Sequence, residues 1–480
     1  MNHKPVFFVT GMLLLILSAA MLVPMITDLA NRNADWRVFA GAEISAAFAG
    51  FLLIFTNRER EFRMTVRETF LTVFLGWIFM GAFGALPFCL SGLNLDVAHG
   101  FFEAMSGLTT TGMTVVTGLD GQPHGILLWR AILHWLGGIG ALALSLSLLP
   151  HLQVSGMQVF KAQSFDIAKI LPSASQTGAY ILLIYSGLTA VCALLLDHAG
   201  MSLFEAACHA MAAISTGGFS TSDDSVGHFD SAMIESILMY FMILGSLPFT
   251  LYLRMARGDL MILFRDNQVR AFLSGLAVLA LTYVLYLLAA SPLSLSGALR
   301  QGTFKAVTLM TTSGFTLHDG GIWGPFAAGI GFLAAFIGGC SGSAAGGIRV
   351  FRFQILLSVL KLQVRRLIVP DGVFQAYHNK KPLDAATQNA VLAFLFAFVL
   401  LVAAAGILLM MTGLEFQTAF GASFAALTNT GPALTGLVGP VTAYGALSPP
   451  ALWILSACML LGRLEIFGAL VFFAPRFWRG

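Results

Sequence analysis

Four short strings of small and hydroxyl-bearing residues are the parts of this sequence best suited to chemistry. They read Thr110-Thr111-Gly112-Met113, Ser215-Thr216-Gly217-Gly218, Thr312-Ser313-Gly314-Phe315 and Asn429-Thr430-Gly431-Pro432. Backbone carbonyls and hydroxyl oxygens can replace the water shell of a dehydrated cation. Glycine permits the backbone angles that aim successive carbonyls the same way. One Thr-Gly pair is a common turn, but four such strings, with reference glycines 105, 97 and 117 residues apart, predict an ion filter.

Each string follows a short apolar stretch that is too short to span a bilayer. These stretches are 97–108, 203–214, 299–311 and 416–427. Stretches of this length are often re-entrant, whereas a spanning helix needs about 20 residues. Ten longer apolar stretches surround them, at 6–26, 38–55, 70–90, 125–149, 180–196, 233–253, 271–289, 322–339, 390–411 and 452–473. The unit of helix, short helix, turn and helix therefore occurs four times, which is an internal repeat.

The composition is that of a membrane protein. Of the 480 residues, 57% are hydrophobic and only 10% are charged, against about 25% charged in soluble domains. The net charge of +3 is too small to indicate a nucleic-acid partner. The first apolar stretch is long and has only Lys4 near its start, which favours a retained helix over a signal peptide. No cysteine pair has the spacing of a zinc site or a disulfide framework; the five are Cys89, Cys192, Cys208, Cys340 and Cys458.

The basic residues indicate an orientation. Most of the 26 lysines and arginines follow alternate helices or flank the termini. They are Lys4, Arg58, Arg60, Arg63, Arg67, Lys161, Lys169, Arg254, Arg257, Arg265, Arg270, Arg349, Arg352, Lys361, Arg365, Arg366, Lys380, Lys381, Arg476 and Arg479. Because positive residues favour the cytoplasm, both termini are expected inside and the four turns outside. Asp96, Asp120, Asp223, Asp224 and Asp319 then lie outside, either concentrating cations or simply solvating loops.

The chain resembles the Trk/Ktr/HKT superfamily, and within it the TrkH-type potassium transport proteins. The resemblance covers nearly the whole chain. Its carriers are Phe102-Glu103-Ala104 before Thr109-Thr110-Thr111-Gly112, then Trp135-Leu136-Gly137-Gly138, Ser215-Thr216-Gly217-Gly218-Phe219-Ser220, Gly338-Gly339-Cys340-Ser341-Gly342-Ser343, Thr428-Asn429-Thr430-Gly431-Pro432 and Leu461-Gly462-Arg463-Leu464-Glu465. The resemblance implies an all-α polytopic membrane fold, with four helix–pore helix–helix repeats around one pseudo-fourfold pore.

The resemblance also implies how the chain is divided and what it assembles with. Two extra transmembrane helices would occupy residues 1–64, followed by pore repeats at 65–160, 161–260, 261–372 and 373–480. The protein would be a homodimer in the bacterial inner membrane, with one pore per subunit. A cytoplasmic nucleotide-binding ring of the TrkA type would regulate it.

The ion implied by the resemblance is K+. In this family a glycine in every filter turn accompanies potassium selectivity, and a serine in the first turn accompanies sodium transport in some plant relatives. The filter residues would be Thr110, Thr111, Gly112, Ser215, Thr216, Gly217, Thr312, Ser313, Gly314, Asn429, Thr430 and Gly431.

Glycines crowd the end of the eighth long stretch and predict a break there. The segment contains Gly338, Gly339, Cys340, Ser341, Gly342, Ser343, Gly346 and Gly347, and each glycine weakens a helix by about 1 kcal/mol relative to alanine. In the resembled family this is an intramembrane loop that obstructs the pore below the filter. The alternative is a helix-packing face, because Gly342 and Gly346 have the GxxxG spacing. No GK[ST] follows, so the segment is not a Walker loop.

Arg463 lies within the last apolar stretch. A charge inside a membrane is costly and is functional by default. The resemblance implies that Arg463 projects toward the pore beneath the filter and belongs to the gate. The alternative is a structural salt bridge, although Glu465, two positions on, would face another side of a helix.

Other classes of function stay open at this point. A proton- or sodium-coupled potassium symporter would need an ionisable relay, for which Glu43, Glu235 and Arg130 are candidates, and a less selective Na/K pathway is a further possibility. An enzyme is not indicated, because His124, His134, His151 and His209 form no HExxH motif. The basic segment 349–381 is either a docking site for a partner or the ordinary positive-inside signal.

Overall fold

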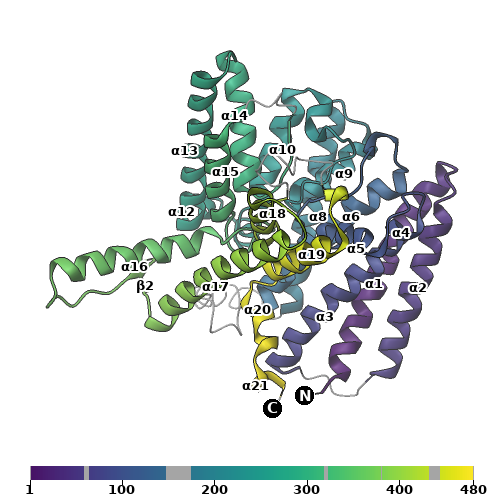
Figure 1. Cartoon of the computed structure of the whole chain (residues 1–480), viewed down its shortest axis with the longest axis horizontal. Coiled ribbons are helices and arrows are strands. Elements are labelled where there is room, and N and C mark those ends of the chain that lie inside the picture. Colours follow the sequence, from purple (N-terminus) through teal and green to yellow (C-terminus); the bar gives the residue numbers. More distant parts are fainter. Residues whose placement is uncertain are drawn as a thin grey trace.

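The computed structural model describes residues 2–58, 64–147, 174–317, 323–379, 381–431 and 444–478. These residues are almost entirely helical (Figure 1), as the sequence predicts. Within the described part, the strands are a small antiparallel hairpin, β1 (Tyr377–His378) and β2 (Lys381–Pro382). The predicted residues Arg60, Arg63, His151, Lys161, Lys169, Asp319, Lys380, Pro432 and Arg479, and the boundary at 160/161, lie outside the described residues.

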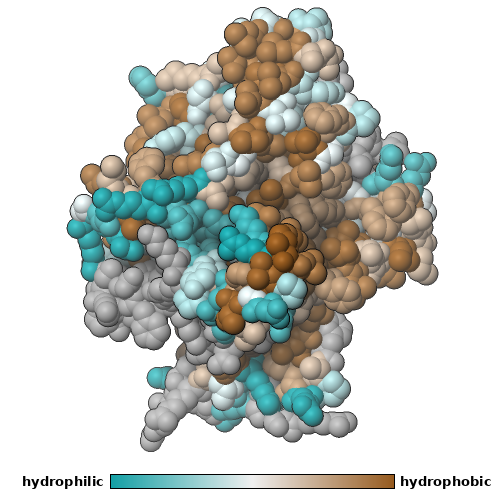
Figure 2. Space-filling model, turned by 90° about the vertical axis from the view of Figure 1, so that its left-hand side faces the viewer, coloured by the Kyte–Doolittle hydropathy of each residue, from teal (hydrophilic) through white to brown (hydrophobic). Residues whose placement is uncertain are grey.

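Seven helical spans in the described residues are long and apolar enough to cross a membrane. They are α1 (Lys4–Ala30), α2 (Trp36–Thr56), α3 (Val66–Gly84) continued by α4 (Leu86–Leu90), α6 (His124–Ser147), α8 (Ala174–His198), α13 (Asn267–Ala290) and α17 (Ala385–Met410). Their outer faces expose large apolar side chains, such as Val278, Leu281 and Leu285 of α13. Figure 2 shows hydrophobic residues covering the upper part of one face, above a band of hydrophilic ones. This is the surface expected of helices that face lipid.

Four short helices lie between the longer ones, one in each repeat. They are α5 (Val97–Leu108), α9 (Leu203–Ile214), α14 (Leu295–Met310) and α18 (Phe416–Thr428). Three of them begin at the predicted residue, and α14 begins four residues earlier. Asp96, Ser202 and Ser294 explain where the first three start, because each side chain accepts the N–H of the residue three positions on.

The helix that follows each short helix is called the inner helix of its repeat. Several inner helices are shorter or more bent than the full-length helices that the sequence predicts. The inner helix of repeat 2 is α10 (Ala232–Gly245), which is bent by 93° from α11 (Phe249–Met255). Pro248 stands at this break, where it lacks an N–H to continue the helix. In repeat 3, α15 (Pro325–Ile337) has only 13 residues and stops before Gly338.

The last inner helix, α19 (Pro449–Arg463), is 15 residues long and ends at Arg463, so this arginine is not in a helix interior as predicted. Glu465 and Ile466 have φ of 61° and 44°, which turns the chain out of the helix. The shorter elements α20 (Phe467–Leu470), η4 (Val471–Phe473) and α21 (Pro475–Trp478) follow.

The remaining elements connect these units. The turns η1 (Leu119–Gly121), η2 (Ser225–Phe229) and η3 (Tyr444–Ala446) precede inner helices, and α12 (Ile262–Arg265) precedes α13. Helix α1 packs along α2 and also contacts α3 and α6, which attaches the two extra helices to repeat 1. Helix α16 (Val350–Ile368) projects to the side, and α1 begins and α21 ends toward the same lower side of the molecule (Figure 1).

Candidate ion filter and gate

The four short helices end in the same way. Just past the end of each helix, one residue adopts a left-handed conformation although it is not glycine. These residues are Thr110, Thr216, Thr312 and Asn429, with φ of 52°, 54°, 58° and 51°. The following N–H returns to the carbonyl five residues back, at 2.9 to 3.1 Å, from Thr111, Gly217, Ser313 and Thr430. This is the Schellman arrangement that closes helix C-termini. The chain therefore leaves each short helix along an equivalent path.

A second left-handed residue follows two positions later, and it is always glycine. Gly112, Gly218, Gly314 and Gly431 have φ of 84°, 84°, 78° and 94°. The sequence pattern uses Gly217 as the counterpart of Gly112, but Gly218 occupies the equivalent position in the structure. Gly217 instead corresponds to Thr111, Ser313 and Thr430. Because the second string has two adjacent glycines, the sequence alone does not show which of them is equivalent to Gly112.

The turns pack against one another as parts of a ring. A β-carbon added to Gly112 would lie 2.2 Å from the carbonyl oxygen of Gly217, in the next turn. One added to Gly218 would lie 1.9 Å from the Ser313 oxygen, and one added to Gly431 would lie 2.6 Å from the Thr111 oxygen. These separations are far below van der Waals contact, so glycine is required by position as well as by φ.

The turns present oxygens that have no hydrogen-bond donor within the described residues. No described residue donates a hydrogen bond to the backbone carbonyls of Thr110, Thr111, Thr216, Thr312 or Ser313, although all five residues are buried. Buried carbonyls are almost always satisfied. Such oxygens at equivalent places in successive turns are what a dehydrated cation requires.

The hydroxyl groups of the turns are largely used to hold the turns in shape. Thr111 Oγ1 contacts Thr109 Oγ1 at 2.6 Å, and Ser313 Oγ contacts Thr311 Oγ1 at 2.9 Å. The Asn429 amide donates to Thr111 Oγ1 at 3.0 Å, which ties the fourth turn to the first. The predicted hydroxyl ligands are therefore brought together, but many of them already have protein partners.

The predicted gate segment is a loop, residues 338–349, and it lies against the ends of the pore helices. Gly346 N–H donates to Thr312 Oγ1 at 2.7 Å, and Gly347 N–H donates to the Thr428 carbonyl at 2.8 Å. A β-carbon on Gly346 would lie 2.2 Å from that Thr428 oxygen. Gly342 and Gly346 are thus loop residues and do not form a helix-packing face.

The loop also fills the break between α10 and α11. Cys340 N–H donates to the Ser246 carbonyl and Ala344 N–H to the Gly245 carbonyl, both at 3.1 Å. In return, Phe249 N–H donates to the Gly342 carbonyl at 2.9 Å. A broken helix exposes backbone groups that hydrocarbon cannot satisfy. The loop satisfies them, so the break and the loop depend on each other.

Arg463 connects the loop to the inner helix of repeat 1. Its side chain is buried and donates to the Ala344 carbonyl at 2.9 Å and to the Gly137 carbonyl at 3.4 Å. Glu465 does not pair with Arg463. It pairs with Arg349 at 3.1 Å and with Arg352, at the start of α16. The positive charge of Arg463 therefore stays next to the loop, beneath the turns.

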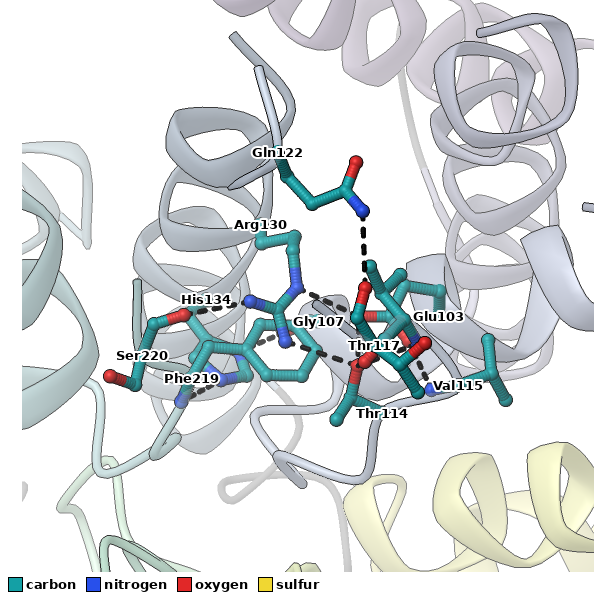
Figure 3. A network of polar contacts seen from close by, with 11 residues as sticks. Glu103, Gly107, Thr114, Val115, Thr117, Gln122, Arg130, His134, Phe219 and Ser220 are labelled. Atoms are coloured by element: carbon teal, nitrogen blue, oxygen red, sulfur yellow. Dashed lines mark hydrogen bonds and ion pairs between the residues drawn. The ribbon is translucent and has the colours of Figure 1, made fainter. Parts of the chain in front are cut away.

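The other ionisable candidates have partners. Glu235 on α10 forms a two-point ion pair with Arg300 on α14, at 2.7 and 2.8 Å. Arg130 on α6 pairs with Glu103 on α5 at 2.8 Å (Figure 3). Glu43 accepts a hydrogen bond from Ser18 at 3.0 Å. These side chains form no continuous relay among the described residues.

The acidic residues that the sequence predicts to lie outside serve different purposes. Asp120 and Asp224 are exposed, and Asp223 is half-buried and accepts the Leu119 N–H at 3.1 Å. Asp96 caps α5, and the hydrogen bonds from the backbone and ring of His99 hold the pKa of its carboxyl below the usual value. The exposed Asp120 and Asp224 can attract cations, whereas Asp223 and Asp96 also hold the backbone in place.

His134 has a structural role. His134 bridges two repeats: its Nδ1–H donates to the Gly107 carbonyl at 2.8 Å, and its Nε2 accepts the Phe219 N–H at 3.1 Å. No group of three or more possible metal ligands from His, Cys, Asp and Glu occurs among the described residues. His134 and the Glu103–Arg130 pair support the turns and were not predicted in that role. The one feature of the sequence that could have indicated this role is that each is an ionisable residue inside an apolar stretch.

Comparison with known proteins agrees with this geometry. A family model described as TrkH, cation transport protein, matches residues 36–479. The Trk system potassium uptake protein TrkH of Escherichia coli (strain K12) is 36% identical over 485 residues, covering 100% of both chains. The Trk system potassium uptake protein TrkI of Halomonas elongata is 35% identical over 478 residues, covering 99% of this chain and 97% of the relative.

A solved structure extends the comparison to three dimensions. The crystal structure of the potassium transporter TrkH from Vibrio parahaemolyticus superimposes with a TM-score of 0.93 at 34% identity, covering 100% of both chains. The sequence match and the structural match thus both extend over the full length of the chain. The chain belongs to the TrkH family of cation transport proteins, a family of membrane transporters and not of enzymes.

Proposed function

We propose that this chain carries potassium ions into the cell across the bacterial inner membrane, through a single pore in each subunit. The observation that carries the proposal is the set of buried carbonyls that accept no hydrogen bond from any described residue, found in three of the four equivalent turns. The filter is formed by Thr110-Thr111-Gly112, Thr216-Gly217-Gly218, Thr312-Ser313-Gly314 and Asn429-Thr430-Gly431, with Ser215 supporting the second turn. Potassium is favoured because the similar proteins are named for potassium uptake and because every turn keeps its glycine.

The loop 338–349 is the gate in this proposal. It contacts the ends of two pore helices and fills the break in α10, so its position is coupled to both. Arg463 holds the loop through Ala344 and puts a positive charge on the ion path. A gate of this kind opens when something binds its open state more tightly than its closed state.

The regulator that fits is a cytoplasmic nucleotide-binding ring of the TrkA type. Helix α16 starts directly after the loop and projects from the body, so a protein bound to α16 would pull on the loop (Figure 1). Arg365 and Arg366 in its last turn are exposed and offer positive charge to such a partner. The chain would act as a homodimer, with both termini in the cytoplasm, as the positive-inside rule favours.

Passive flow is favoured over proton coupling. A proton relay needs ionisable side chains that form a continuous hydrogen-bonded path, but among the described residues Glu235 and Glu103 are held in two separate ion pairs.

Growth of a bacterium that lacks its own potassium-uptake systems tests the proposal. Expression of the chain with its native partner should restore growth at low external potassium, but not when Gly112 is replaced by aspartate. Absence of rescue, with the chain present in the membrane and the partner bound, would contradict potassium uptake.

A further inference from the structure

A buried ion pair lies directly behind the first two filter turns. Glu103 on α5 and Arg130 on α6 have exposed fractions of 0% and 1%, and they are joined through Arg130 Nε and Glu103 Oε1 at 2.8 Å. Figure 3 shows the two side chains surrounded by backbone and side-chain partners from both turns. Buried charges are retained only when they are paired and fully hydrogen-bonded. The partners of this pair show what it holds in place.

On the first turn, the pair binds the segment that follows Gly112. Glu103 Oε2 accepts the Val115 N–H at 2.8 Å, and Glu103 Oε1 accepts the Thr114 hydroxyl at 2.8 Å. Arg130 also donates to Thr114 Oγ1 at 3.1 Å. Both carboxylate oxygens are therefore used, and both act on the two residues that leave the filter.

On the second turn, the same arginine binds the segment that follows Gly218. Arg130 donates to the Ser220 carbonyl at 2.8 Å, and its guanidinium lies 4.1 Å from the centre of the Phe219 ring. The pair thus spans from turn 1 to turn 2 and sets the separation between them. At this separation between the two turns, the Gly217 carbonyl oxygen lies against Gly112.

The equivalent position in the other repeats holds no carboxylate. The position of Glu103, seven residues before the left-handed residue, is occupied by His209, Lys305 and Ala422 in repeats 2, 3 and 4. His209 is buried and contacts Ser220 Oγ at 3.0 Å, which adds a neutral link behind turn 2. Lys305 instead lies 5.3 Å from the Trp323 ring, and Ala422 has no polar side chain. The four turns share one backbone pattern, but the buried ion pair links turns 1 and 2.

We propose that Glu103 and Arg130 are positioning residues that set the preference of the filter for potassium over sodium, by fixing the distance between turns 1 and 2. The inference rests on the proposed potassium filter. Cation selectivity depends on the number and placement of coordinating carbonyls, and binding sites need supporting groups that hold them within about 0.5 Å. Without the pair, the distance between turns 1 and 2 is no longer fixed, and the filter carbonyls can rearrange around the smaller sodium ion.

The test is Glu103→Gln in the full-length protein, purified and placed in liposomes. Glutamine keeps the size of the side chain and the bond from Val115 N–H, but it leaves Arg130 without its counter-charge. Relative potassium and sodium flux is measured, together with the melting temperature in equal concentrations of KCl and NaCl. The second readout needs no open gate, because a bound ion raises the melting temperature. We expect the potassium preference to fall about tenfold, the scale of one lost hydrogen bond to a charged group.

The matched control is Glu235→Gln. Glu235 is also buried and paired with an arginine, the partly exposed Arg300, but neither residue contacts a filter turn among the described residues. Glu235→Gln should lower stability and leave the potassium preference unchanged. If Glu103→Gln does not fold, the double variant Glu103→Gln with Arg130→Gln removes both charges and is measured in its place.

The outcomes are distinct. A folded Glu103→Gln or double variant with the parent's potassium preference would overturn the inference. An equal loss in Glu235→Gln would also overturn it, because the effect would then be general destabilisation. A parent protein that does not distinguish the two ions in either assay would refute the proposed potassium filter itself.

Discussion

The contact between the gate loop and the pore helices provides a prediction that can be worked out from the structure. In Gly346→Ala, the new β-carbon would lie 2.2 Å from the Thr428 carbonyl oxygen and 3.2 Å from Thr312 Oγ1. Backbone atoms cannot give way by that much, so the loop must move away from the filter. The bonds from Gly346 N–H and Gly347 N–H, at 2.7 and 2.8 Å, would be lost together.

The size of the effect follows from these two hydrogen bonds. Each contributes about 0.5–1.5 kcal/mol net, so the closed state loses about 1–3 kcal/mol relative to the open one. This shifts the equilibrium toward the open state by roughly 5- to 150-fold. Passive potassium flux in liposomes, without the regulatory partner, should rise accordingly.

The control for this experiment is Gly329→Ala in α15, just before the loop. Gly329 is helical and exposed, and a β-carbon there would meet no atom within 4 Å. Its flux should equal that of the parent. If folded Gly346→Ala protein shows a flux no higher than the parent, the loop does not close the pore and the gating argument fails.

Three further predictions concern charges near the gate. Arg463→Gln removes the positive charge beside Ala344 and one anchor of the loop, so potassium flux should increase several-fold in the same liposomes; a decrease would contradict its role as a barrier. Glu465→Gln leaves two buried arginines without their carboxylate, so the protein should lose about 3–5 kcal/mol of stability, seen as a lower melting temperature; an unchanged value would mean that the pairs are not formed. Replacing Arg365 and Arg366 by glutamine should weaken retention of the nucleotide-binding partner in a pull-down, and equal retention would remove α16 as its docking site.

Much of the architecture was predictable from the sequence. The short helices α5 and α9 match their predicted ranges, because an apolar stretch of about 12 residues ending in a hydroxyl-glycine string is distinctive. The glycine-rich break after α15 was predictable for a similar reason, since several glycines in succession cannot sustain a helix. These features depend on residues that are neighbours in sequence.

Features that depend on distant residues were not predictable. The bend at Pro248 is stable because loop residues Cys340 and Ala344, about 100 positions away, satisfy the carbonyls that it exposes. Likewise, Glu465 pairs with Arg349 rather than with its near neighbour Arg463. Sequence spacing argued against the local pair but gave no means of finding the distant one.

The register of the second turn shows a different limit. Gly217 and Gly218 are adjacent, and either satisfies a string of hydroxyl residues followed by glycine. Only the left-handed φ of 84° at Gly218 separates them. The Cβ position of Gly217 is restricted for another reason, because it would lie 2.4 Å from the His134 ring. Backbone conformation, and not residue type, assigns the two roles.

The most direct test of the central claim is ion preference in liposomes that contain the purified chain under opposed potassium and sodium gradients. The comparison is between the parent, Gly112→Ser, and the control Gly121→Ser, where a side chain would meet no atom within 4 Å. The filter account predicts potassium flux above sodium flux in the parent and in the control, and a reduced preference in Gly112→Ser. Equal preference in all three folded proteins would contradict the assignment of the four turns as the filter.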